Sequence, residues 1–194
     1  AMVGGIVMNN ASGMNCGTHA NSDKELLSAK IVLADGTRLN TGDPESRMTF
    51  EKNHTPFLNK IIEIRDEIRN DNELSDRIRK KYSIKNVTGL NLLPFVIYDD
   101  PFDIIAHLMV GSEGTLAFLS EVTMKTEHDY PYSASAMLYF SDIKDACRAV
   151  VAMKPGPVFS AELLDKKSLA SVNDTTGTGL TAVLTETKGD TPEE

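Results

Sequence analysis

The chain of 194 residues has no tryptophan, and aromatic residues make up only 6% of it. Its two cysteines, Cys16 and Cys147, lie far apart and neither belongs to a CxxC motif. This scarcity excludes a disulfide-rich scaffold and favours a reducing intracellular compartment. The four histidines include no pair at the three- or four-residue spacing that places two ligands on one helix face. We therefore expect no metal site built by this chain alone.

Positive charge is also scarce, because 20 Lys and Arg face 28 Asp and Glu, which leaves a formal net charge of −8. The basic residues are dispersed, and the one run, Arg77–Lys81, is typical of the solvated end of a helix. A nucleic-acid partner is therefore not expected. No apolar run approaches the roughly 20 residues that a membrane span requires. With 41% hydrophobic residues, the chain can fold as one large domain or two small ones.

The stretch from Gly111 to Phe118 links a predicted helix to a predicted strand. Asp99 or Asp100 can cap the helix, and Pro101 suits its first position. The strand should bury one parity and expose the other: buried Leu116, Phe118, Val122 and Met124, exposed Glu121, Thr123 and Lys125. Two interpretations of the turn stay open. Its glycines can present backbone N–H groups to a phosphate, with Glu113 turned elsewhere, or Gly111 can simply end the helix.

Residues 4–22 are rich in glycine, serine and asparagine, which is typical either of a wall that lets a planar ligand approach or of an Ω-like surface loop. Residues 26–40 predict a hairpin around Asp35-Gly36. Residues 51–82 predict two amphipathic helices broken near Asn70 to Asn72, as an insertion packed on a sheet. In the irregular segment 83–98, Lys85 and Thr88 can meet a substrate carboxylate, or Lys85 is only a solvated residue before a buried turn.

A second segment begins near Glu127 to Pro131, where polar residues and proline end the preceding strand. The pattern beyond it predicts strand, helix, strand, helix and strand over 135–140, 142–153, 158–164, 165–172 and 180–188. This order indicates part of an α+β sandwich. Both ends of the chain read as interior sequence, so we expect an excised fragment of a longer protein.

In this order and separation, three features resemble the FAD-linked oxidases of the vanillyl-alcohol oxidase superfamily, which share the para-cresol methylhydroxylase (PCMH) type of FAD domain. They are Gly4-Gly5 with Asn10-Ala11-Ser12-Gly13, the hairpin at Val32 to Gly36, and Gly111 to Leu116. The likeness is strongest to the D-lactate dehydrogenase and glycolate oxidase subunit branch. It implies an α+β fold: residues 1–127 as the second subdomain of the FAD domain, with a mixed sheet, flanking helices and the helical insertion, and residues 128–194 as the start of a ferredoxin-like cap.

The resemblance also implies site residues. Contacts to FAD carry over to Gly4, Gly5, Asn10, Ala11, Ser12, Gly13, Ser22, Gly111, Glu113, Gly114, Thr115 and Leu116. Substrate contacts carry over to Lys85 and Thr88. Ser12, Ser22 and Lys24 depart from the residues that relatives often carry, and the change at Lys24 reverses a charge near the cofactor. The family's glycine-rich pyrophosphate loop and its metal-binding histidine cluster have no equivalent in this chain.

These features predict part of an FAD-dependent oxidoreductase that oxidises a D-2-hydroxy acid, D-lactate or glycolate, by hydride transfer to flavin. No catalytic base is visible, so we expect the chain alone to be inactive. A cytoplasmic location is expected, with peripheral binding to the inner face of the membrane as the alternative. Two other classes stay open: a non-catalytic nucleotide-binding module, and a structural or interaction domain. Substrate, electron acceptor and oligomeric state do not follow from these residues.

Overall fold

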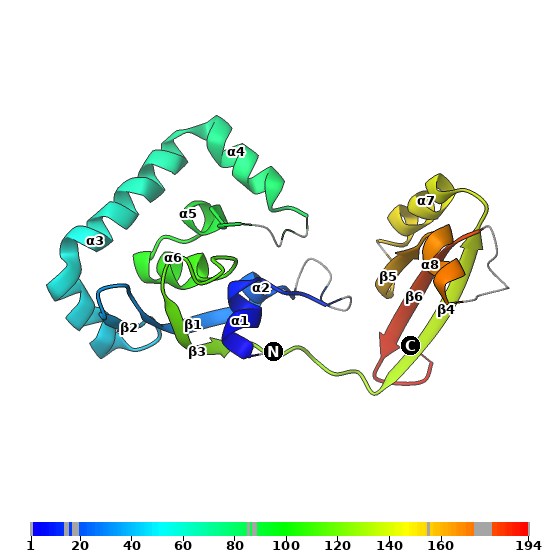
Figure 1. Ribbon diagram of the computed structural model, residues 1–194, viewed down its shortest axis with the longest axis horizontal. Helices are drawn as coiled ribbons and strands as arrows, with labels where there is room; N and C mark the ends of the chain where they lie inside the picture. The colour runs from blue at the N-terminus through cyan, green and yellow to red at the C-terminus, as the bar shows by residue number, and fades with distance from the viewer. Residues whose placement is uncertain are drawn as a thin grey trace. The chain divides into compact units, whose positions relative to one another are not determined.

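A computed structural model of the chain describes residues 2–13, 16, 20–84, 86, 89–154, 156–172 and 180–193 (Figure 1). The chain divides into two compact units: Ala1–Ser12 with Thr18–Glu127, and Gly13–Gly17 with His128–Glu194. The first unit contains α1 (Val3–Met8), α2 (Ser22–Glu25), β1 (Leu26–Val32), β2 (Arg38–Asn40), α3 (Pro44–Asn70), α4 (Asn72–Lys81), α5 (Leu93–Ile97), α6 (Pro101–Leu108) and β3 (Phe118–Met124). The second contains β4 (Tyr132–Phe140), α7 (Ile143–Met153), β5 (Val158–Leu164), α8 (Lys166–Ser171) and β6 (Thr181–Gly189).

The first unit is built on a sheet with strand order β2-β1-β3. The predicted hairpin is confirmed, since β1 and β2 pair antiparallel and the N–H of Gly36 donates to the carbonyl of Leu33 at 2.9 Å. β3 also pairs antiparallel with β1. The α+β prediction is confirmed, but the described pairings of this sheet are all antiparallel where a mixed sheet was expected. The tight hairpin makes β1 and β2 antiparallel. β3 lies on the other side of β1 and runs in the same direction as β2, so it is also antiparallel to β1.

A β-bulge in β3 corrects the predicted parity of the first residues of that strand, whereas Val122 and Met124 pack against the core as predicted. The register shifts by one residue, because Lys30 pairs with Glu121 whereas Ile31 pairs with Leu119. The extra residue at Ser120 reverses which side chains face the core. Leu119 is therefore 6% exposed, and Phe118, which the simple alternation placed inside, is 68% exposed.

The helices of the first unit surround two apolar clusters. One lies between the sheet and helices α1, α3 and α6, and contains Val7, Ile31, Phe50, Ile105 and Leu119 among others. The other joins α3, α4, α5 and α6 through residues that include Ile68, Ile78, Phe95 and Ile104. Contacts of α6 with β1, and of α3 with both α5 and α6, connect these layers (Figure 1). The two clusters together position the turn that follows α6.

Helix boundaries follow local capping signals. Asp43 caps α3 by accepting from the N–H groups of Glu45 and Ser46, and Pro44 takes the first position. The helical insertion therefore begins seven residues before the predicted residue 51. Its break is confirmed at Asp71, whose side chain caps α4. The short helix α5 was not predicted within the irregular segment 83–98.

The second unit is a sheet of strand order β4-β6-β5 with α7 and α8 packed on it. Its elements match the predicted order, and both pairs that involve β6 are antiparallel. Asp142 and Asp165 cap α7 and α8 through the N–H groups of Lys144 and Ser168.

Candidate functional site

The turn after α6 is a tight reversal that docks on the end of α1. The N–H of Thr115 donates to the carbonyl of Ser112 at 2.9 Å, and the two central residues, Glu113 and Gly114, have φ of +52° and +77°. Two consecutive positive φ values define a type I′ turn. The N–H of Glu113 donates to the carbonyl of Met8 at 3.0 Å. The turn is thus fixed to α1, a helix more than a hundred residues away in the chain.

α1 ends in a Schellman motif that shapes the facing loop. The N–H of Ala11 donates to the carbonyl of Ile6 at 3.0 Å, and the N–H of Asn10 donates to that of Val7 at 2.9 Å. Asn10 takes the left-handed conformation that this motif requires, with φ of +53°. Asn9 Nδ2 then donates to Glu113 Oε1 at 2.6 Å. The bond therefore joins the residue just before the predicted contacts Asn10 to Gly13 to Glu113, one of the predicted contacts in the turn.

Asn10 is only 5% exposed, and its side chain links the end of α1 to two other segments, at Asp23 and Asn86. Its Nδ2 donates to the carbonyl of Asn86 at 3.2 Å, and its Oδ1 accepts from the N–H of Asp23 at 3.4 Å. Ser22, beside Asp23 in α2, donates from Oγ to the carbonyl of Ala11 at 3.5 Å. Asn10 thus serves as an interior strut, since both ends of its amide are occupied by the protein.

Gly111 is the one position in the turn where a side chain has no room. Its φ is +82°, and a Cβ built there would lie 2.9 Å from the carbonyl oxygen of Gly89. Gly114 has a similar φ, but a Cβ there would meet nothing within 4 Å. Glycine at position 111 therefore lets the backbone of the turn pack against that of Gly89, whereas the space beside Gly114 contains no protein atom within 4 Å.

Three of the predicted site residues lie away from this contact, and two more are not among the described residues. Gly4 and Gly5 lie inside α1, so the loop expected over residues 4–22 begins only after Met8, and the contact of both glycines with FAD stays a prediction. The buried side chains of Val7 and Met8 anchor α1 in the core. A Cβ built on Gly4 would lie 3.3 Å from the carbonyl oxygen of Leu119, so glycine lets the helix pack closely against β3. Gly13 belongs to the second unit. Lys85 and Thr88 lie outside the described residues. The other predicted FAD contacts all belong to the first unit: Asn10, Ala11, Ser12, Ser22, Gly111, Glu113, Gly114, Thr115 and Leu116.

A polar cluster surrounds the buried His107 of α6, the helix that precedes the turn. Tyr98 stacks on His107 with ring centres 4.2 Å apart, and its hydroxyl lies 3.0 Å from Nε2. His107 Nδ1 lies 2.8 Å from the carbonyl of Asp103, so Nδ1 carries the proton and Nε2 accepts from Tyr98. Burial, and then the negative charges of Asp23 and Asp103, raise the pKa of Tyr98.

Asp23 completes this cluster. Its Oδ1 is buried and, within the described residues, makes no hydrogen bond. A buried carboxylate oxygen without a donor is uncommon and marks a place where a donor would be stabilised. No local sequence signal identifies Asp23, Tyr98 and His107 as neighbours, because they come from α2, the residue after α5, and α6.

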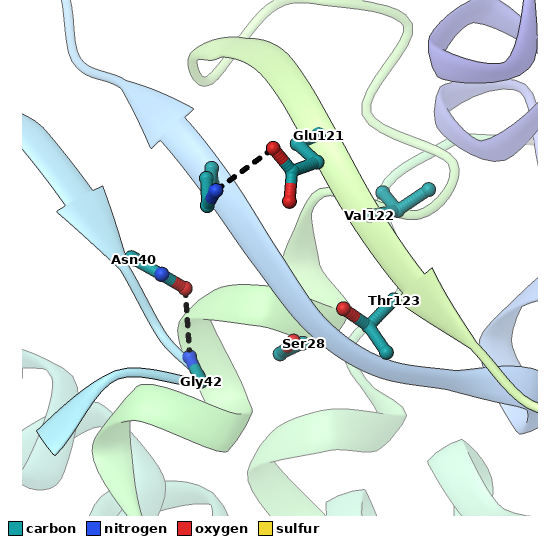
Figure 2. A pocket seen from close by; sticks show the side chains of 7 residues that line it. Ser28, Asn40, Gly42, Glu121, Val122 and Thr123 are labelled. Carbon is teal, nitrogen blue, oxygen red and sulfur yellow. Dashed lines mark hydrogen bonds and ion pairs between the residues drawn. The ribbon is translucent and has the colours of Figure 1, made fainter.

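A separate polar hollow of about 200 Å³ lies on the other face of the sheet (Figure 2). Ser28 and Lys30 line it and alternate along β1 with the buried Ala29 and Ile31, so the hollow faces away from the core. Lys30 Nζ pairs with Glu121 Oε2 across the strands at 2.8 Å. The hollow contains none of the predicted site residues.

The ligands that the turn after α6 could bind depend on which of its backbone N–H groups are not already used within the protein. The N–H groups of Glu113 and Thr115 are used within the protein, whereas in the described part of the chain those of Gly114 and Leu116 make no hydrogen bond. Two amide donors beside a carboxylate and a carboxamide suit a ligand that carries both hydroxyl donors and oxygen acceptors. Among the described residues no group of three or more His, Cys, Asp or Glu could hold a metal ion.

The chain is an α+β protein with antiparallel sheets and flanking helices, an architecture compatible with an FAD-binding subdomain of a lactate dehydrogenase-like protein. It is 32% identical over 83 residues to "D-lactate dehydrogenase [cytochrome], mitochondrial" of Arabidopsis thaliana. The match covers 42% of this chain and 15% of the relative. No protein-family model matches the chain. In the described ranges, no helix has the length and apolar character needed to cross a bilayer.

Proposed function

We propose that this chain forms one wall of a flavin site in an oxidoreductase that acts on a D-2-hydroxy acid, with D-lactate or glycolate as substrate. The observation that carries the proposal is the hydrogen bond from Asn9 to Glu113, which joins two loops that the sequence separately suggested as FAD contacts. The similarity to a D-lactate dehydrogenase supports the same class of reaction.

The turn after α6 and the adjoining end of α1 offer hydrogen-bonding groups that suit the sugar of a nucleotide or a phosphate ester. The free amides of Gly114 and Leu116 would donate to ligand oxygens, and Glu113, already oriented by Asn9, would accept from a ribose hydroxyl. Bound FAD would supply the hydride acceptor, so the protein's task here is to position it. Because Glu113 is held by Asn9 at 2.6 Å, we assign it to binding and not to proton transfer.

The chain would need further parts to act as an enzyme. The turns supply few donors, and neither a general base nor a second wall is placed by the residues described in the first unit. The relative extends far beyond the matched segment, which covers 15% of it. We therefore propose that a glycine-rich pyrophosphate loop precedes Ala1 in a longer protein, and that the chain alone binds FAD weakly or not at all.

The test compares this chain with the longer protein. We expect the longer protein to be yellow, with stoichiometric flavin absorbance, and to reduce a dye in the presence of D-lactate or glycolate. The chain alone should do neither. A colourless longer protein whose melting temperature rises with an adenine nucleotide would instead favour a nucleotide-binding module. No response to any of these ligands would favour a structural domain.

A single substitution tests the assigned wall in the longer protein. Glu113→Gln removes the carboxylate but preserves the size of the side chain, and we expect FAD affinity to fall about ten- to a hundredfold, the equivalent of one charge-assisted hydrogen bond. Glu127→Gln, which removes an exposed carboxylate at the end of the first unit, is the matched control. Equal affinities for both variants and the parent would remove Glu113 from the site.

A further inference from the structure

Both stretches of predicted FAD contacts also touch a third segment of the chain. From the first stretch, Asn10 Nδ2 donates to the carbonyl oxygen of Asn86 at 3.2 Å. From the second, Gly111 lies so close to Gly89 that a Cβ built on it would be 2.9 Å from the carbonyl oxygen of Gly89. Two contacts from distant parts of the chain therefore converge on one short stretch, residues 86–89, which we call the supporting segment.

Neither contact can be replaced by a small local adjustment. Asn10 is 5% exposed, and the other end of its amide is also used, since Oδ1 accepts from the N–H of Asp23 at 3.4 Å. A flipped amide would set its oxygen against the carbonyl of Asn86 and its NH2 group against an N–H. At Gly111 the obstacle is a backbone atom. Because packed interiors transmit strain, a shift of either stretch would displace the supporting segment.

The chain that follows the supporting segment is fixed to two helices. The Tyr82 hydroxyl, at the end of α4, donates to the carbonyl of Leu90 at 3.0 Å. Asn91 is 5% exposed, and its Oδ1 accepts from the N–H of Leu93, the first residue of α5, at 2.9 Å. Gly89 has a φ of +72°, which glycine adopts without strain. The segment therefore links the predicted flavin wall to α4 and α5.

We propose that Asn10 and Gly111 couple the flavin site to the supporting segment, so that FAD bound at the turn stabilises the segment in the conformation that holds a substrate carboxylate. The inference rests on the proposed function, and on Lys85 and Thr88, the residues at this segment that suit a carboxylate. Asn10 is then a positioning residue, because both polar ends of its side chain are used within the protein. Linkage makes the coupling reciprocal: an ordered segment raises FAD affinity by the same factor.

Hydrogen–deuterium exchange with this chain tests the coupling without any ligand. Asn10→Asp keeps the acceptor for the N–H of Asp23 and tolerates a positive φ, but it turns a carboxylate oxygen toward the carbonyl of Asn86. We expect peptides spanning 84–92 to exchange about three- to tenfold faster, the equivalent of one lost hydrogen bond. Asn53→Asp makes the same change at an exposed position of α3 and should leave these peptides unchanged.

A second variant applies the perturbation from the opposite side. Gly89→Ala adds a Cβ where nothing lies within 4 Å, so it disturbs the segment only through its φ of +72°. Peptides spanning 111–117 should then exchange about three- to tenfold faster. Gly36→Ala imposes the same strain in the hairpin, at φ of +86°, and should leave those peptides unchanged. If one of the two variants fails to fold, the other still decides the coupling.

In the longer protein the same exchange is measured with FAD removed and restored. FAD should slow exchange at both 111–117 and 84–92 in the parent, whereas Asn10→Asp should lose the protection at 84–92. With D-lactate or glycolate as substrate, Asn10→Asp should raise KM about three- to tenfold and change kcat less, because the loosened segment weakens substrate binding more than the reaction at the flavin. Asn53→Asp should behave as the parent.

The coupling and the proposed function fail in different ways. Unchanged exchange at 84–92 in Asn10→Asp, or at 111–117 in Gly89→Ala, would overturn the coupling, as would FAD protection confined to the turn. A longer protein that binds no FAD would refute the proposed function and with it the role in substrate binding, whereas the ligand-free exchange of this chain decides by itself whether the two segments are coupled.

Discussion

Replacing Gly111 with alanine tests whether the turn after α6 is fixed by backbone packing. Gly111 and Gly114 both have φ near +80°, so an alanine at either position should cost about 1–2 kcal/mol for its left-handed conformation. At Gly111 the new Cβ also lies 2.9 Å from the carbonyl oxygen of Gly89, a backbone atom that cannot rotate away. Relieving such an overlap costs a further 1–3 kcal/mol or so. We therefore expect Gly111→Ala to be the more destabilising by about 2 kcal/mol.

Urea denaturation followed by far-UV circular dichroism measures this difference. The long helices α3 and α4 lie in the same unit as both glycines, so the helical signal reports the relevant transition. With a slope of about 2 kcal/mol/M, the Gly111→Ala midpoint should lie about 1 M below that of Gly114→Ala. Gly36→Ala, which has φ of +86° and open space around it, is a second control and should behave like Gly114→Ala. Equal midpoints for Gly111→Ala and Gly114→Ala would refute the packing argument.

Three further predictions concern the bulge, the buried tyrosine and the link between α3 and α6. Leu119→Ala should cost about 2–5 kcal/mol and Phe118→Ala less than about 1 kcal/mol in the same assay, and the reverse order would refute the bulge. Burial raises the pKa of Tyr98 above its ordinary value of 10.0, so the unfolded state loses the tyrosine proton at a lower pH than the folded state. The free energy of unfolding should therefore fall as the pH rises above 10.0. Thermal melts from pH 8 to 11 should show a smaller alkaline loss in Tyr98→Phe. Arg47→Met should cost about 1–3 kcal/mol, since Arg47 pairs with Asp100 at 2.6 Å and with Asp103 at 3.2 Å, whereas Lys60→Met, at an exposed pair, should be nearly neutral in urea denaturation.

Several elements could be predicted because their signals lie within a few residues. Asp100 and Pro101 begin α6, the Asp35-Gly36 turn forms a hairpin, and Asp71 separates α3 from α4, each through hydrogen bonds between near neighbours. The α+β class follows from these patterns, since an alternation of period two and a period near 3.6 each specify an element without reference to the rest of the chain.

The errors arose where a distant segment overrode the local pattern. Gly4 and Gly5 suggest a loop, yet they lie in a helix because Val7 and Met8 are buried in a core built by β3 and α6. The alternation in β3 placed Phe118 inside, but pairing with β1 inserts a bulge that buries Leu119 instead. Neither outcome is visible in the segment itself, since each depends on what packs against it.

By itself, the sequence determined the class of fold, most element boundaries and two loops of unusual composition. Only the tertiary structure decided that these loops touch, through Asn9 and Glu113, 104 residues apart. It also decided that Tyr98, His107 and Asp23, which come from three separate elements, form one polar cluster. The physical reason is the same in each case: a hydrogen bond or a strand pair between distant residues depends on the path of the whole backbone, and no local propensity encodes it.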